Sequence, residues 1–232
     1  MKLVKWFLLA AALLLVSGCA QRERIMLPPA VDLGDTQRLT VVYWENYTLD
    51  PGLSLELERS LVQHLDQYYH VADPYDVEST LYRLGVRRGM PMTRDLAVEI
   101  GSVLDADLIV AGEVQYFFED VRQSAPQREE PFPPGTGYQW YVNHTTSTSV
   151  VIRGRVIQVD DGEVVFTEEV EGRKVLTVKD SLQWNEPTPP PSTLIPQPDR
   201  SQLPQARLGA IEDAARRFTS QLLPRYEWRR IP

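Results

Sequence analysis

The stretch TRDLAVEIGSVLDADLIVAGEV, residues 93–114, decides the fold. Thr93 is a residue type that caps the first turn of a helix. The apolar residues that follow recur at helical spacing, at Leu96, Ile100, Val103 and Leu104. Ala106-Asp107 ends this helix, and Leu108–Val114 is then apolar almost throughout. Because both faces of such a strand are apolar, we expect it at the centre of a sheet that is covered on both sides.

The residues before this stretch alternate between strand and helix signals. Leu39–Trp44 is β-branched and aromatic, which is typical of a strand. Asp50-Pro51 combines a capping residue with a helix-starting proline. It precedes an apolar stripe at Leu53, Leu57, Leu61, Leu65 and Tyr68. Val71-Ala72 predicts a brief strand, and Asp73-Pro74 starts a further helix, which Gly85 ends.

The residues after this stretch predict a hairpin and a closing helix. Val150–Val159 and Val164–Val170 flank Asp160-Asp161-Gly162, a turn signal, and Arg153 and Arg155 are expected to pair with glutamates of the second arm. The closing helix follows from the apolar stripe Leu208, Ile211, Ala215, Phe218 and Leu222, before Pro224. The order is therefore β-α-(β)-α-α-β-β-β-α. It predicts an α/β fold with helices packed on a small mixed sheet.

Two proline-rich insertions interrupt this order, at residues 119–147 and 183–204. Their prolines lack amide donors, so neither is expected to be regular throughout. Proline-rich loops with exposed aromatic residues can serve as docking surfaces. For 119–147, docking and a solvated excursion on the domain rim remain equal alternatives, whereas 183–204 is expected to be such an excursion. The candidate partner surface consists of Phe132, Tyr138, Trp140 and Tyr141.

Residues 1–18 have the features of a secretory signal peptide. Two lysines precede the apolar run Trp6–Val16, which is shorter than the roughly 20 residues of a membrane-spanning helix. Leu15-Val16-Ser17-Gly18-Cys19 resembles the lipobox of bacterial lipoproteins. The resemblance implies that Cys19 carries a lipid anchor with acyl chains such as palmitate, and that Ala20 directs it to the outer membrane. An ordinary signal peptide with an incidental cysteine is the alternative.

The charge of the mature chain argues against nucleic acid as a partner. Removal of residues 1–18, with their two lysines, lowers the formal net charge from −8 to −10. Binding to nucleic acid requires clustered Lys and Arg. Cys19 is the only cysteine, so no disulfide is expected. Residues 19–37 are predicted to be a tether, and residues 38–232 a single α/β domain that contains both insertions.

No catalytic, cofactor or metal site is predicted, and the chain is expected not to be an enzyme. His64, His70 and His144 are the only histidines, and none of them has the spacing of a zinc helix. Asp105 and Asp107 flank a turn in which Asp is favoured for local hydrogen bonds. An enzyme would instead need histidines or carboxylates gathered in one pocket, so a histidine close to two acids would favour that alternative.

The decisive stretch also carries a resemblance. The segment DADLIVAGEV after a helix, residues 105–114, is similar to a group of bacterial envelope proteins. This group includes the curli-secretion channel subunit, the lipoprotein that activates penicillin-binding proteins, and the amino-terminal domain of TolB. The resemblance extends over residues 39–175 and 205–224, where Val151–Val165 and Ala210–Leu222 correspond to the group's later strands and closing helix.

Together these features predict a non-enzymatic accessory lipoprotein. It would be anchored at the periplasmic face of the outer membrane and bind proteins of envelope assembly, secretion or cell-wall synthesis. The alternative is an oligomeric subunit of an outer-membrane export channel. The insertions are too polar and proline-rich for the membrane-spanning strands that such a channel subunit would contribute. A homo-oligomer is compatible with either function.

Overall fold

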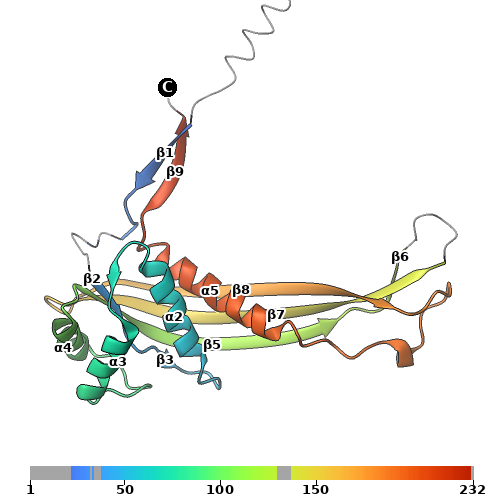
Figure 1. The fold of residues 1–232 in the computed structure, drawn as a ribbon, viewed down its shortest axis with the longest axis horizontal. Helices are drawn as coiled ribbons and strands as arrows, with labels where there is room; N and C mark the ends of the chain where they lie inside the picture. Colours follow the sequence, from blue (N-terminus) through green and yellow to red (C-terminus); the bar gives the residue numbers. More distant parts are fainter. Residues whose placement is uncertain (1–21, 32, 34–37, 130–136, 231–232) are drawn as a thin grey trace, which may run out of the picture. The chain divides into compact units, whose positions relative to one another are not determined.

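A computed structural model describes residues 22–31, 33, 38–129 and 137–230 (Figure 1). Cys19 and the signal peptide lie outside these residues. The chain forms two compact units, which are considered separately: residues 1–32 with 220–232, and residues 33–219. The smaller unit contains β1 (Arg22–Leu27) and β9 (Arg225–Arg230), which pair in antiparallel orientation. β1 lies within the segment that was expected to be a tether without regular structure.

The larger unit is built on a mixed seven-stranded sheet. Its main strands, in spatial order, are β4 (His70–Val71), β2 (Arg38–Val41), β5 (Leu108–Gln123), β7 (Gln139–Gln158) and β8 (Val164–Leu182). Two short strands complete it: β3 (Glu45–Asn46) on β5 and β6 (Gln127–Glu129) on β7. β4, β2 and β3 run parallel to their partners, and β7 is antiparallel to β5, β6 and β8. The predicted α/β class with a mixed sheet is confirmed.

The helices of this unit are α2 (Leu53–Leu65), α3 (Pro74–Arg83), α4 (Arg94–Leu104) and α5 (Leu203–Thr219), with a 3₁₀ turn at Ser192–Leu194. The predicted caps of α3 and α4 are confirmed. Asp73 accepts a hydrogen bond from the Tyr75 amide at 2.7 Å, and Thr93 accepts one from the Leu96 amide at 3.3 Å. None of the described helices combines the length and apolarity needed to cross a membrane.

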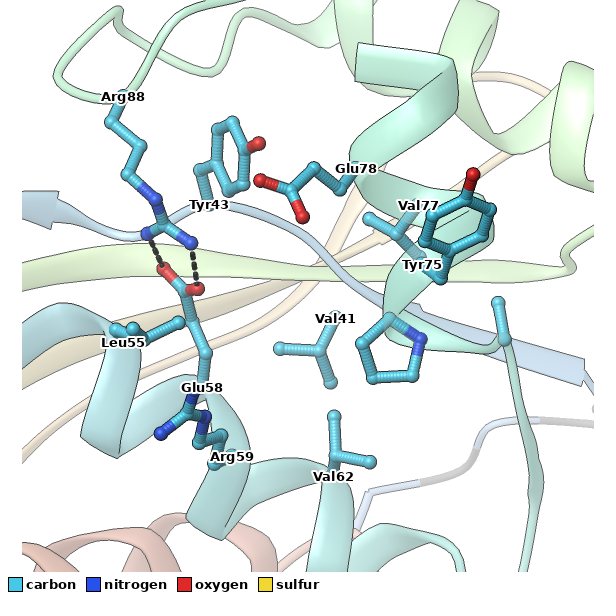
Figure 2. A pocket seen from close by; sticks show the side chains of 12 residues that line it. Val41, Tyr43, Leu55, Glu58, Arg59, Val62, Tyr75, Val77, Glu78 and Arg88 are labelled. Atoms are coloured by element: carbon cyan, nitrogen blue, oxygen red, sulfur yellow. Dashed lines mark hydrogen bonds and ion pairs between the residues drawn. The ribbon is translucent and has the colours of Figure 1, made fainter. Parts of the chain in front are cut away.

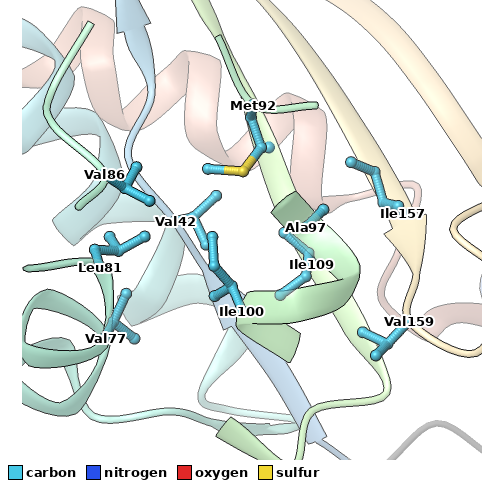
Figure 3. Close-up of a cluster of buried hydrophobic side chains, with 11 residues drawn as sticks. Val42, Val77, Leu81, Val86, Met92, Ala97, Ile100, Ile109, Ile157 and Val159 are labelled. Carbon is cyan, nitrogen blue, oxygen red and sulfur yellow. The ribbon is translucent and has the colours of Figure 1, made fainter. Parts of the chain in front are cut away.

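The helices cover both faces of the sheet. Ile109 and Ala111 of β5 and Ile157 of β7 belong to the buried cluster shown in Figure 3. The cluster also contains residues of α3 and α4, which include Ile100. The other face carries α2 and α5, which lie side by side (Figure 1). On that face Trp44 meets Phe218 of α5 edge to face, at 5.9 Å between ring centroids. The apolar segment Leu108–Val114 is thus central and buried on both faces, as predicted.

The first insertion is more regular than the sequence suggested. β5 continues to Gln123 and β7 begins at Gln139, so most of residues 119–147 belongs to strands. The two strands pair without a break from Tyr116–Val151 to Gln123–His144. The run from Val142 to Val151 is rich in Thr, Ser and Val, most of them β-branched residues that favour strands. Among the described residues, the only proline of this insertion is Pro126, which lies in the loop between β5 and β6.

The second insertion packs against the sheet. The indole Nε1 of Trp140 donates to the carbonyl of Glu186 at 2.8 Å, and the amide of Asp199 donates to Nδ1 of His144 at 3.1 Å. Residues 183–202 therefore run over the end of β7 that α5 does not reach. We call this segment the strap. It agrees with the expected excursion packed on the rim of the domain.

Candidate partner-binding surface

The predicted surface residues do not share one face. Phe132 lies outside the described residues. Trp140 is only 7% exposed and packs beneath the strap, so its ring is not available to a partner. Tyr141, its neighbour on β7, points to the opposite side of the sheet because side chains alternate along a strand. Tyr138 precedes β7 and lies under the guanidinium of Arg128, at 4.7 Å from the ring centroid.

Alternation along β7 separates a covered face from an uncovered one. Every second residue from Trp140 to Val156 is buried, towards α5 and the strap, whereas the residues between them from Tyr141 to Val151 are partly exposed. We call the second surface the open sheet face. It consists of Tyr116, Phe118, Asp120 and Arg122 on β5, alternate residues of β7 from Tyr141 to Val151, and alternate residues of β8 from Glu171 to Ser181.

The most exposed aromatic groups on the open sheet face are Tyr116 and Phe118. Their rings stack at 6.5 Å between centroids with an interplanar angle of 7°, and they are 53% and 43% exposed. A β-bulge at Gln115 shifts the register between Val114 and Tyr116, which turns Tyr116 to this side. The sequence analysis missed this pair because it ended the strand at Val114. The continued spacing of large residues at 116 and 118 was the available signal.

A groove of about 660 Å³ lies beside this pair, between β5 and the loop from Tyr47 to Pro51. Tyr47 and Leu49 are exposed at its rim. On the same loop, Asp50 forms an ion pair with Arg207 of α5, which also donates to Glu56 at 2.9 Å. The hydrogen bond from Arg207 holds the pKa of Asp50 below its ordinary value. The groove therefore combines exposed apolar side chains with a carboxylate that an ion pair holds in place.

A second hollow, of about 240 Å³, lies between α2 and α3 (Figure 2). Aliphatic side chains form much of its wall, and Arg88 closes one end by donating two hydrogen bonds of 2.8 Å to Glu58. Glu58 also accepts from the Trp44 amide at 2.8 Å, and Arg88 stacks on Tyr43 at 4.0 Å. Burial raises the pKa of Glu58, while Arg88 and the Trp44 amide oppose that rise. Because this ion pair is already satisfied, the hollow offers a ligand mainly apolar contact.

The histidines are not gathered at either hollow. His144 is 3% exposed, with its Nε2 3.7 Å from the Asp180 carboxylate and its Nδ1 bound to the amide of Asp199. His144 therefore lies near two acidic residues, the arrangement named above for the enzyme alternative. The Asp199 carboxylate itself binds the hydroxyl and amide of Ser201. Among the described residues, no group of His, Cys, Asp or Glu side chains is arranged to hold a metal ion.

No family model and no curated protein matches the sequence. Solved structures with a similar fold include the lipoprotein GNA1162 from Neisseria meningitidis, at 14% identity over 60% of this chain and 83% of that one, with a TM-score of 0.43. The LpoB C-terminal domain from Salmonella enterica has 11% identity over 62% and 84%, with a TM-score of 0.37. A PelC dodecamer from Paraburkholderia phytofirmans has 15% identity over 88% and 100%, with a TM-score of 0.37. These neighbours include bacterial lipoproteins of the group that the sequence resembles, and at these values the likeness assigns neither a family nor a function.

Proposed function

We propose that this chain is a lipid-anchored, non-enzymatic accessory protein at the periplasmic face of the outer membrane. Its role is to bind protein partners in envelope assembly, secretion or cell-wall synthesis. The observation that carries the proposal is the stacked and exposed pair Tyr116–Phe118 on the open sheet face. Aromatic residues are over-represented among the side chains that dominate binding energy at interfaces, and exposed apolar patches mark such sites.

The mechanism is tethering. A lipid on Cys19 would confine the protein to one membrane surface and raise its effective concentration near partners there. A single acyl chain binds a membrane only marginally, so the two or more chains implied by the lipobox are needed for stable anchoring. The open sheet face then supplies the contact, and Tyr141 is the member of the originally predicted aromatic set that lies on it.

The test is cross-linking in intact envelopes followed by affinity purification. The double variant Tyr116→Ala/Phe118→Ala is compared with Tyr75→Ala/Tyr82→Ala, which removes two exposed aromatic rings from α3. We expect the first variant to lose its envelope-protein partners, because it loses the apolar anchors, and the second to retain them. The proposal is wrong if both variants capture the same partners as the unmodified protein.

The anchor is tested separately with Cys19→Ala. We expect the unmodified protein in the outer-membrane fraction and Cys19→Ala outside it. Partner capture should fall in Cys19→Ala, because the effective concentration at the membrane is lost. An unchanged membrane fraction would argue for an ordinary signal peptide and an incidental cysteine.

The export-channel subunit is the second candidate function. It is favoured by β8, a strand of 19 residues that pairs only with β7 among the described strands. Such an edge exposes backbone donors and acceptors that a second copy of the chain can pair with. A strictly monomeric molecular mass of the detergent-extracted protein would exclude this second function, because an export channel requires a ring of subunits.

A further inference from the structure

The small unit is a two-stranded ribbon whose faces differ in chemistry. In an antiparallel pair, directly opposed residues lie on the same face. The pairing places Arg22 opposite Arg230, Arg24 opposite Trp228, and Met26 opposite Tyr226. These six positions form the first face of the ribbon, and none of them is acidic.

The second face is mixed in charge. Its opposed pairs are Glu23–Arg229, Ile25–Glu227 and Leu27–Arg225. Among the residues whose side chains are described, this face carries Arg225 together with Glu23 and Glu227, whereas the first face carries Arg24 and no acidic residue. The positive charge of the described ribbon is therefore one-sided. This charge stands out because the chain as a whole has a formal net charge of −8.

The described side chains of the first face are available to a partner. Met26 is 61% exposed and Tyr226 45% exposed. The guanidinium of Arg24 lies over the Tyr226 ring at 3.9 Å from its centroid, so cation and aromatic ring form one surface. The first face therefore combines positive charge with exposed apolar and aromatic groups.

We propose that the first face of the β1–β9 ribbon binds the surface of a membrane that contains anionic phospholipids. Arginine fits phosphate groups, and Trp and Tyr are enriched at the level of the headgroups, where one end of the ring is wet and the other apolar. Anionic headgroups attract basic residues close to the surface. The ribbon is thus a second, protein-made contact with the lipid surface.

The position of the ribbon in the chain supports this occupant. Only Ala20 and Gln21 separate the predicted lipid attachment at Cys19 from β1. Two intervening residues span at most about 10 Å between the attachment and the strand, so an anchored chain would keep the ribbon beside the headgroups. The inference rests on the proposed function for this location, and its test removes the lipid.

The test measures vesicle binding by the mature chain from residue 19, carrying Cys19→Ser. Vesicles of phosphatidylglycerol are compared with vesicles of phosphatidylcholine, each at low and high salt. Arg22→Gln/Arg24→Gln is compared with Arg225→Gln/Arg229→Gln. Both variants remove two positive charges from the ribbon, the first from the first face and the second from the second face.

We expect binding to phosphatidylglycerol only, weakening with salt. The first variant should bind about 25-fold more weakly, at about fivefold for each arginine near the surface, and the second should change far less. Hydrogen exchange of the unmodified ribbon provides a measurement that does not depend on the variants. Amides of β1 and β9 should become protected when phosphatidylglycerol vesicles are added.

Three results would overturn the inference. Equal weakening in both variants would show that net charge alone decides binding. Displacement by inorganic phosphate, but not by chloride at equal ionic strength, would indicate a small-anion site. Binding of a DNA duplex as tight as that of the vesicles would indicate a nucleic-acid surface. None of these results affects the lipid anchor, which the fractionation of Cys19→Ala tests independently.

Discussion

Gly172 of β8 allows α5 to approach the sheet closely, and its replacement by alanine tests the packing of this helix. A Cβ at position 172 would lie 2.1 Å from the carbonyl oxygen of Ala210 and 2.4 Å from the amide nitrogen of Ala214. Both atoms belong to the backbone of α5. No side-chain rotation can relieve such contacts, so either the helix or the strand must move.

The size of that movement follows from the distances. An ordinary contact of a Cβ begins at about 3.4 Å, so α5 must retreat by roughly 1.3 Å to relieve the contact with Ala210. The buried residues of this helix, which include Ile211 and Phe218, lose packing with it. Overpacking of a core costs about 1–3 kcal/mol. We expect Gly172→Ala at the upper end, about 3 kcal/mol, because a whole helix is displaced.

Gly209→Ala is the matched control, since position 209 lies on α5 itself. The three atoms nearest to a Cβ there belong to the Lys174 side chain, at 3.0–3.3 Å, and this flexible chain can move aside. Alanine is favoured over glycine inside a helix by about 1 kcal/mol. We therefore expect Gly209→Ala to leave the free energy of unfolding unchanged or to raise it by up to about 1 kcal/mol.

Urea unfolding, monitored by circular dichroism, measures both changes. The slope of the free energy of unfolding against urea concentration should be the same in all three proteins, which checks that the same transition is compared. The reasoning is refuted if Gly172→Ala is as stable as the unmodified protein, because α5 would then not lie against β8 at this distance. A loss in Gly209→Ala as large as that in Gly172→Ala would equally refute it.

Three further predictions concern polar contacts. Arg88→Ala leaves the buried Glu58 without its ion-pair partner and should lower the free energy of unfolding by about 2 kcal/mol near pH 7. This loss is smaller than for a fully buried pair, because Arg88 is partly exposed to solvent. Because burial raises the pKa of Glu58, its carboxyl can bind a proton near pH 4, and Arg88→Ala should then lower the free energy of unfolding by less. Equal losses at pH 7 and pH 4 would contradict this. The pKa of Asp50 is lowered by Arg207, so its contribution is present above the ordinary value of 3.8 and lost as pH falls further. In Arg207→Ala, the free energy of unfolding should therefore fall by about 1 kcal/mol less between neutral and acid pH than in the unmodified protein. An equal fall in both proteins would argue against the ion pair. Thr93→Ala removes the cap of α4 and should cost about 1 kcal/mol in thermal unfolding, whereas Thr93→Ser should restore most of it.

Much of the fold could be predicted because its signals are local. The caps at Asp73 and Thr93 and the αL position of Gly85 depend on neighbouring residues in the chain. The central strand was recognisable because Leu108–Val114 is apolar except at Glu113, and such a run is stable mainly when it is buried. Of the two arginines expected to pair across the hairpin, Arg153 donates to Glu169 at 2.8 Å. The expectation was wrong for Arg155, which lies opposite Thr167 and donates to the carbonyl of Met92 at 2.6 Å.

The candidate surface was predictable only in part. Sequence analysis identified the aromatic residues of 119–147 but could not separate Trp140, which is covered by the strap, from Tyr141, which is on the open sheet face. That distinction depends on strand register and on a segment more than 40 residues away. Tyr116 was missed because its orientation depends on a bulge, and a bulge is decided by pairing with β7.

The sequence by itself therefore determined the order of the helices and main strands of the larger unit, the starts of α3 and α4, the central strand and the prediction of a lipid-anchored mature chain. These depend on side-chain periodicity, capping chemistry and composition, which act over a few residues. Only the tertiary structure decided how far β5, β7 and β8 extend, which face of them stays open, and that β1 pairs with β9 across the length of the chain. Strand pairing joins residues distant in sequence, and its register depends on burial that no local pattern specifies.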